Sequence, residues 1–312
     1  MGFLDMHGGL GRTFGGLGLS ISGVDTCLNM QVAEAFEANG PAAGRALHCA
    51  RRVLDHLGLE HEVRIDIRTA IPEHAGLGSG TQLALATTAA IDRLFDLNLG
   101  MDGIAALADR GARSGIGLWT FRHGGFVVDG GRGPSTGVPP LLSRIAFPEQ
   151  WRILLILDRT RAGMNGRLEK ETFRDIRPMS AEVSGQLCRH LLMQVLPALG
   201  EQDIKTFSIG VTAIQHLIGD YFAPYQGGRF SSPLVAQVCD WLGQQGIRGL
   251  GQSSWGPTGF ALLENEIAAS HILKLARQRW GDEAALEFML CKGSNEAAGI
   301  AIESHPMQVA GA

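Results

Sequence analysis

Three closely spaced glycines mark the first stretch that could hold a ligand, in residues 71–86, IPEHAGLGSGTQLALA. Residues 62–70 before it alternate apolar and polar side chains, which predicts a half-buried strand. Residues 80–95 after it have the apolar spacing of a helix. Gly76, Gly78 and Gly80 would let backbone amides approach an anion, and the helix start adds partial positive charge. The segment therefore predicts a phosphate site, with a glycine-rich turn that merely begins a helix as the alternative.

The spacing of these glycines fits neither the Walker nor the Rossmann pattern, so the residues alone leave both readings open. Other reactive residues add little. The five cysteines form no C-x-x-C pair, which indicates buried, reduced thiols and a cytoplasmic protein. The ten histidines include no H-E-x-x-H motif or comparable cluster, so a zinc site has little support.

Composition describes an ordinary globular chain, with 45% hydrophobic and 19% charged residues. A net charge of −4 offers no general attraction to nucleic acid or to an anionic membrane, so any phosphate site must be local. We find no apolar run long enough to span a membrane and no signal peptide. The 43 glycines cluster at 8–18, 76–80, 124–133 and 249–259, which predicts several tight loops.

The elements that must position these loops are predicted to mix strands and helices in an α+β fold. A length of 312 residues favours two domains, and the proline-rich stretch 134–148 is the candidate boundary, giving domains 1–148 and 149–312. Residues 2–12 read as a functional loop and 158–171 as a polar loop. Further predicted elements are helices at 41–59, 80–96, 101–112, 180–197, 203–218, 231–246 and 265–280, and strands at 15–24, 62–70, 125–128, 151–157, 247–250, 259–263, 285–290 and 298–303.

Several segments, taken together and in order, resemble a known family. Pro72-x-x-x-Gly76-Leu-Gly-Ser79 resembles the phosphate loop of the GHMP kinase superfamily. With Phe3-Leu-Asp5, Gly9-Leu-Gly-Arg12, Ser114-Gly-Ile-Gly117, residues 123–131 (HGGFVVDGG) and residues 252–257 (QSSWGP), the chain is similar to the β-ribofuranosylaminobenzene 5′-phosphate synthases of methanopterin biosynthesis. The resemblance implies a GHMP-kinase-like fold with a ribosomal-protein-S5-like N-terminal domain and a ferredoxin-like C-terminal domain.

Departures from the kinase pattern favour the synthase family. Kinases of the superfamily usually have a second Ser after G-L-G-S, whose hydroxyl helps hold the metal of ATP, and here that residue is Gly80. Their later glycine motif is interrupted here by Trp255 and Pro257. Many of them carry an Asp after the S-G segment to deprotonate the acceptor, but residues 116–122 contain no carboxylate. A site without that base and that hydroxyl is poorly equipped for phosphoryl transfer.

The resemblance implies the condensation of 5-phosphoribosyl 1-diphosphate with 4-aminobenzoate or 4-hydroxybenzoate, with release of CO2 and diphosphate. Such a reaction needs cations and amides around the leaving diphosphate and accurate placement of the aromatic ring. Mg²⁺ is expected with the diphosphate, with unknown ligands, and no organic cofactor is needed. The family also implies small-molecule substrates and a homodimer, with neither a nucleic-acid nor a membrane partner.

The same resemblance suggests roles for individual residues. The catalytic group would be Asp5, Arg12 and His123, and the aromatic-substrate pocket would contain Ser253, Ser254 and Trp255. Phosphate or diphosphate would be bound by Gly76, Leu77, Gly78, Ser79, Gly80, Thr81 and Arg159, with Arg161 and Arg167 near the last. Structural alternatives stay open: a solvated arginine, an aspartate that stabilises a turn, a loop histidine or a core tryptophan.

Two other functions compete with the synthase: an ATP-dependent GHMP small-molecule kinase, and a phosphometabolite-binding protein that has lost turnover. The sequence leaves open which aryl acid is used, the oligomeric state, the metal site and whether ATP still binds. Relatives carry a strand and a basic residue before the segment that matches Gly2. We therefore expect either a mis-set start codon or a missing first strand.

Overall fold

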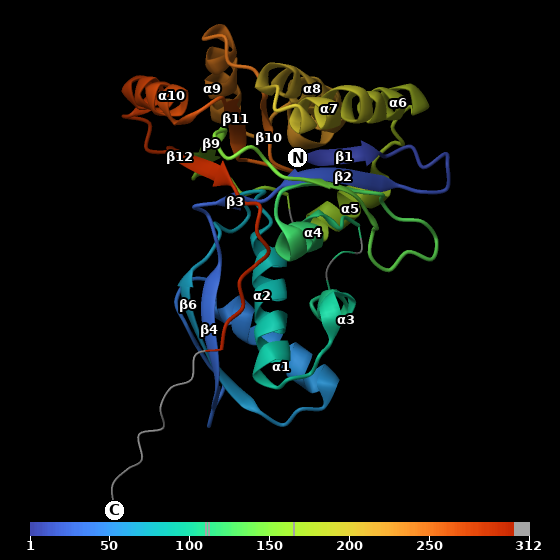
Figure 1. The fold of residues 1–312 in the computed structure, drawn as a ribbon, viewed down its shortest axis with the longest axis vertical. Helices are drawn as coiled ribbons and strands as arrows, with labels where there is room; N and C mark the ends of the chain where they lie inside the picture. Colours follow the sequence, from blue (N-terminus) through green and yellow to red (C-terminus); the bar gives the residue numbers. More distant parts are fainter. Residues whose placement is uncertain (110, 112, 165, 303–312) are drawn as a thin grey trace, which may run out of the picture.

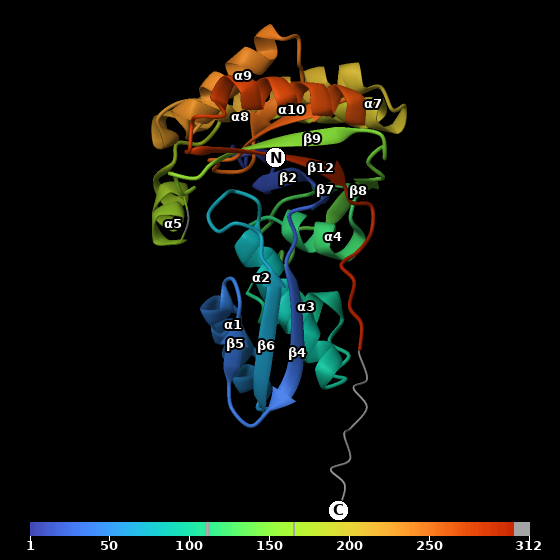
Figure 2. The ribbon, with the colours of Figure 1, turned by 90° about the vertical axis from the view of Figure 1, so that its left-hand side faces the viewer.

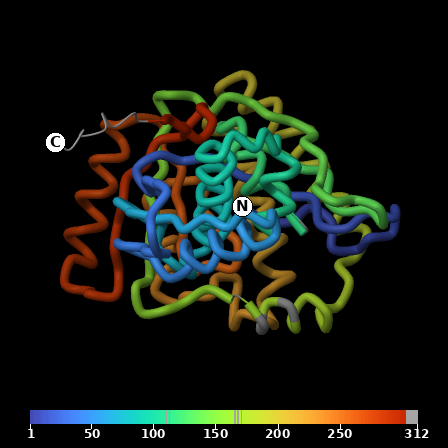
Figure 3. The backbone as a smooth tube through the Cα atoms, turned by 90° about the horizontal axis from the view of Figure 1, so that it is seen from below, coloured from blue at the N-terminus to red at the C-terminus, as the bar shows by residue number. Residues whose placement is uncertain are grey.

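A computed structural model describes residues 1–109, 111, 113–164 and 166–302 of the chain. Its α+β architecture, as predicted, consists of three small sheets and the helices that cover them (Figure 1). Helices α6 to α10 form the top layer, sheets lie beneath them, and α1 to α4 with the third sheet form the lower part (Figures 1 and 2). Seen from below, this lower part lies in front of the rest (Figure 3).

Two antiparallel sheets occupy the middle of the molecule. The first has the order β1-β2-β7-β8, with bounds Gly2–Asp5, Phe14–Leu19, Phe126–Asp129 and Leu141–Ile145. The second has the order β10-β11-β9-β12-β3, with bounds Leu250–Gln252, Gly259–Leu263, Arg152–Asp158, Leu286–Gly293 and Ile21–Ser22. Helices α9 (Pro233–Gln244) and α10 (Glu266–Trp280) pack on the second sheet.

The third sheet has the order β4-β6-β5, with bounds Cys27–Ala33, Glu62–Thr69 and Glu37–Asn39, and β5 pairs parallel to β6. Alternation along β6 buries Val63, Ile65 and Ile67 against α1 (Ala43–Leu57) and α2 (Ser79–Leu94). Helices α3 (Gly100–Leu107) and α4 (Ile116–His123) add buried residues to the same core.

The remaining helices are α5 (Gly166–Asp175), α6 (Ala181–His190), α7 (Leu196–Gly200) and α8 (Ile204–Gln226), with a π-helical turn at Leu191–Val195 between α6 and α7. Their buried faces share one core with the first sheet. Phe147 and Trp151 lie in that core with ring centroids 5.3 Å apart. The division at residue 148 stays a prediction, and the chain on either side of it contributes to one core.

Several segments differ from the predictions. Residues 2–5 form strand β1 instead of a loop, because they pair with β2. The predicted loop 158–171 contains the start of α5, and the proline-rich boundary contains β8. Strands β4 and β5 were not predicted. Residues 298–302 are not a strand; instead, the chain after β12 passes the end of α4, where the Ala298 amide donates to the Phe121 carbonyl, and continues to residue 302 along the groove beside α2 (Figure 1).

None of the helices in these described ranges combines the length and the apolarity that crossing a bilayer requires.

Candidate active site

The glycine loop enters α2 as the sequence predicts. Gly76 and Gly78 have φ values of +74° and +76°, a left-handed conformation that strongly favours glycine. The amides of Thr81 and Gln82 bond to the Gly78 carbonyl, and no side chain caps the helix in the described structure. The N–H groups of Ser79 and Gly80 at the positive end of the helix are therefore suited to bind an anion.

Two other loops hold this loop in place. The Ser253 hydroxyl donates to the Gly76 carbonyl at 2.8 Å, and the Gly163 amide donates to the His74 carbonyl at 2.6 Å. A Cβ on Gly76 would lie 2.2 Å from the Ser253 carbonyl oxygen, and one on Gly163 would lie 2.1 Å from that of Gly256. Only glycine allows these backbones to approach so closely, so the shape of the loop is fixed by packing.

The first turn of α2 also packs against the start of α4. A Cβ on Gly117 would lie 2.6 Å from Cγ2 of Thr81, and Gln82 Nε2 donates to the Gly117 carbonyl at 2.9 Å. The start of α4 therefore has no room for a side chain at Gly117 without movement of Thr81. This tight contact places the segment that lacks a carboxylate directly beside the predicted phosphate loop.

Asp129 fixes the start of α4, a role that sequence reasoning missed. Its fully buried carboxylate accepts hydrogen bonds from the amides of Gly131 (2.8 Å) and Gly115 (3.0 Å) and from the Ser114 hydroxyl (3.3 Å). Burial raises the pKa of Asp129 above its usual value, although these hydrogen bonds oppose the shift. An acidic residue that ends the apolar run FVV and precedes two glycines was the available signal.

Asp5 and Arg12 lie on the β1–β2 hairpin, and both have partners there. Asp5 Oδ1 accepts from the amides of His7 (2.7 Å) and Gly8 (2.9 Å) and from the Ser184 hydroxyl (3.2 Å). Arg12 donates through Nε to the Gly130 carbonyl and through Nη2 to the Gly131 carbonyl, each at 2.8 Å. Both side chains therefore stabilise loops in this structure.

His123 and Arg159 both have partners outside the phosphate loop. His123 ends α4, about 10 Å along the helix from the start that contacts Thr81. Its ring stacks on Trp119, and burial, then the charges of Arg122 and Arg144, lowers the pKa of His123 below its usual value. Arg159 forms an ion pair with Glu287 of β12.

The predicted aromatic pocket divides into two parts. Ser253 contacts the phosphate loop, as described above, and Ser254 has a left-handed φ of +55°. Trp255 is only 7% exposed and belongs to the core, with ring centroids 4.5 Å from Phe222 and 5.4 Å from Phe173. The structure therefore places Trp255 as a packing residue next to the loop that holds Gly76.

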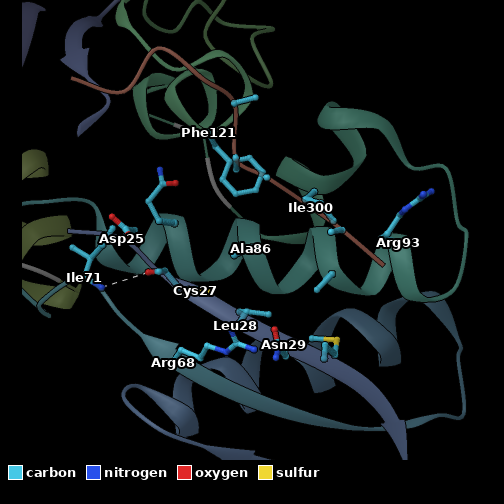
Figure 4. Close-up of a pocket in the computed structure, with 18 of the residues that line it drawn as sticks. Asp25, Cys27, Leu28, Asn29, Arg68, Ile71, Ala86, Arg93, Phe121 and Ile300 are labelled. Carbon is cyan, nitrogen blue, oxygen red and sulfur yellow. Dashed lines mark hydrogen bonds between the residues drawn. The ribbon is translucent and has the colours of Figure 1, made fainter. Parts of the chain in front are cut away.

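Cavities flank both sides of the α2 start. A groove of about 910 Å³ extends from Leu77 and Gln82 along α2, between the edge strand β4 and residues 294–302. Figure 4 shows Arg68 and Asn29 on its sheet side and Phe121 and Ile300 on the opposite side. A second groove, of about 330 Å³, is lined by Gly80 and by three basic residues of α1, Arg45, His48 and Arg52.

Comparisons with known proteins identify the family of the chain. The family models described as GHMP kinases N-terminal domain and GHMP kinases C-terminal match residues 44–121 and 195–281. The chain is 31% identical over 276 residues to a β-ribofuranosylphenol 5′-phosphate synthase of Archaeoglobus fulgidus, which covers 84% of each chain. It is 29% identical over 285 residues to the enzyme of that name from Methanothermobacter thermautotrophicus, covering 84% of this chain and 85% of the relative.

Solved structures share the fold. A mevalonate kinase superimposes with a TM-score of 0.67 at 16% identity, covering 94% of this chain and 96% of the other. The phosphomevalonate kinase of Streptococcus pneumoniae does so with a TM-score of 0.66 at 11% identity, covering 94% and 95%.

Proposed function

The chain belongs to the GHMP superfamily and, within it, to the β-ribofuranosylphenol 5′-phosphate synthase family, and from that premise we propose its reaction. It condenses 5-phosphoribosyl 1-diphosphate with 4-hydroxybenzoate or 4-aminobenzoate and releases CO2 and diphosphate. The phenol in the relatives' name favours 4-hydroxybenzoate. The protein is an enzyme of methanopterin biosynthesis, acting as a decarboxylating pentosyltransferase.

One observation supports this proposal above the others: the anion-binding loop lacks the base of a kinase. Residues 116–122 supply no carboxylate to deprotonate an alcohol, and a side chain at Gly117 would displace the Thr81 methyl group. The Asp129 carboxylate at the start of α4 is buried and bonded to backbone amides. The amides of Ser79 and Gly80 remain suited to an anionic leaving group. The arrangement fits a reaction that stabilises a departing diphosphate and transfers no phosphoryl group.

The chemistry needs no external acid or base. As the bond from the anomeric carbon to diphosphate breaks, the aryl carbon that carries the carboxylate bonds to the anomeric carbon. The carbon–carboxylate bond then breaks, its electron pair restores the aromatic ring, and CO2 leaves. Amides and cations around the diphosphate lower the barrier to the first step, and ring placement governs the second.

Mg²⁺ stays a proposal. The described residues contain no group of three or more His, Cys, Asp and Glu side chains suited to a metal. Magnesium commonly keeps several waters and binds substrate phosphates, so a site with few protein ligands fits it. Bound to the diphosphate, it would neutralise the leaving group. The homodimer and the cytoplasmic location likewise stay predictions.

The test uses purified protein, 5-phosphoribosyl 1-diphosphate and 4-hydroxybenzoate labelled at the ring carboxyl, with 4-aminobenzoate in a second arm. We expect labelled CO2 and diphosphate in equal amounts. ADP formation that depends on an added alcohol, without CO2 from either acid, would replace the synthase by the kinase. Binding of pyrophosphate without any turnover would identify a non-catalytic phosphometabolite-binding protein.

A further inference from the structure

Arg113 is a cation that the sequence analysis did not single out, just before the start of α4. Its guanidinium carbon lies 4.8 Å from the centroid of the Phe173 ring on α5. Its Nη1 atom lies 3.4 Å from Oε1 of Glu169, also on α5. That nitrogen is shielded from solvent and makes no hydrogen bond to the residues that the structure describes. Glu169 balances the charge, but a shielded N–H donor without a hydrogen bond is poorly satisfied, which points to an acceptor in a bound state.

Contacts on both sides connect Arg113 with the phosphate loop. Along the chain, the start of α4 packs on Thr81 and Gln82 through Gly117. Across space, Phe173 packs on Trp255. Two residues before Trp255, the Ser253 hydroxyl donates to the Gly76 carbonyl. Helices α4 and α5 both lie below the central sheets (Figures 1 and 2). Arg113 is therefore linked to both ends of this loop through short chains of contacts.

We propose that Arg113 is a substrate-binding residue whose guanidinium takes a phosphate oxygen of the anion held at the α2 start, with Glu169 as the counter-ion that the substrate displaces. This inference rests on the proposed function. It also extends it, because it places a cation directly before the start of α4, a segment whose residues 116–122 supply no carboxylate. Stacking on Phe173 orients the planar guanidinium, which lysine could not reproduce.

Competition between Glu169 and the substrate gives an unusual expectation. Removing the charge of Glu169 frees Arg113 for the ligand, so Glu169→Gln should tighten anion binding. A purely structural ion pair predicts the opposite, because losing either partner would loosen α5 and weaken any site nearby. Glu266→Gln is the matched control, since Glu266 pairs with Arg152 at the start of β9, remote from these loops.

The experiment is calorimetric titration of the full chain with inorganic pyrophosphate and, separately, with ribose 5-phosphate. We expect Arg113→Ala and Arg113→Lys to raise the Kd at least tenfold, Glu169→Gln to lower it about threefold, and Glu266→Gln to leave it unchanged. An effect confined to pyrophosphate assigns Arg113 to the leaving group, and one confined to ribose 5-phosphate assigns it to the other phosphate. Thermal unfolding of each variant verifies that it is folded.

An unchanged Kd in folded Arg113→Lys, or weaker binding in Glu169→Gln, would overturn this inference. Because titration with pyrophosphate needs no turnover, the result is independent of the CO2 assay. If CO2 is released but the Arg113 variants bind as the wild type does, only the role of Arg113 is wrong. If binding depends on Arg113 but no CO2 is released, only the proposed reaction is wrong.

Discussion

The loop before α2 and the β1–β2 hairpin are both rich in glycine, but they use their polar groups in opposite ways. In the loop, carbonyl groups of His74 and Gly76 accept hydrogen bonds from neighbouring loops, while the first amides of α2 have no side-chain cap. In the hairpin, the side chains of Asp5 and Arg12 bond to backbone groups nearby. Neighbouring loops therefore hold the first region through its carbonyl groups and leave its amides available to a ligand. In the second region, the side chains that could bind a ligand already bond to backbone groups.

The difference indicates that an anion can be bound in two ways, by backbone amides in the first region and by side chains in the second. We call the loop before α2 and the first turn of that helix, residues 74–82, the cradle. It keeps its shape because its glycines pack against other backbones, and its amides need no rearrangement to receive an anion. A side chain such as Arg12 must keep, share or exchange its partners when a substrate arrives. Variants in and between the two regions test this contrast.

Gly76→Ala should have the largest effect. Its Cβ would lie 2.2 Å from the Ser253 carbonyl oxygen and 2.8 Å from that of Gly256, at a left-handed φ. We expect a loss of roughly 3 to 5 kcal/mol in the free energy of unfolding, together with loss of pyrophosphate binding. Gly78→Ala is the matched control, because no atom lies within 4 Å of its Cβ and only the strain of about 1 to 2 kcal/mol remains. Urea unfolding of both variants measures the difference, and equal losses would mean that packing does not shape the cradle.

Asp129→Asn should rank second, because Asp129 joins the two regions. Its carboxylate holds Gly115 at the start of α4 and Gly131, whose carbonyl accepts from Arg12. An asparagine nitrogen would face an N–H donor, so we expect a loss of about 2 to 3 kcal/mol in the free energy of unfolding.

The difference in stability between wild type and Asp129→Asn should change with pH in one direction. Burial raises the pKa of Asp129 in the folded state, so the folded protein keeps this proton to a higher pH than the unfolded chain. Ionisation of Asp129 therefore lowers stability as pH rises above an ordinary aspartate pKa of about 3.9. We expect the stability difference between wild type and Asp129→Asn to shrink over that range, measured by urea unfolding in steps from pH 4 to 7. A difference that grows with pH would contradict the raised pKa.

Gly117→Asp tests whether the cradle can be returned to kinase chemistry. The new Cβ would meet Cγ2 of Thr81 at 2.6 Å, so we expect a loss of about 1 to 2 kcal/mol in unfolding free energy and no alcohol-dependent ADP formation. Adding Thr81→Ser removes that methyl group and should restore part of the stability. Full stability of the single variant would show that the start of α4 is less tightly packed than the structure indicates.

The contrast also shows what the sequence could predict. Strand β6, the glycine loop and α2 were predictable, because alternation, glycine spacing and helical spacing are local signals. The contacts that give the loop its shape were not, because Gly163 and Ser253 reach it only through tertiary packing. The role of Arg113 could not be predicted, because its partners lie on α5 and the polar sequence of that segment was read as a loop. Trp255 was ambiguous, because a core tryptophan and a pocket tryptophan share the same local sequence.

Arg12→Ala should have the smallest effect on stability and a large effect on turnover. Loss of two hydrogen bonds from a largely exposed guanidinium should cost about 1 kcal/mol, measured by urea unfolding. If Arg12 also grips the diphosphate or the aryl carboxylate, CO2 release should fall at least a hundredfold, and Arg12→Lys should recover little of it because lysine lacks the planar fork. Turnover that survives in Arg12→Ala would leave this residue as a stabiliser of the turn at Gly130 and Gly131, and recognition of the anion would then rest on the amides at the α2 start and on Arg113.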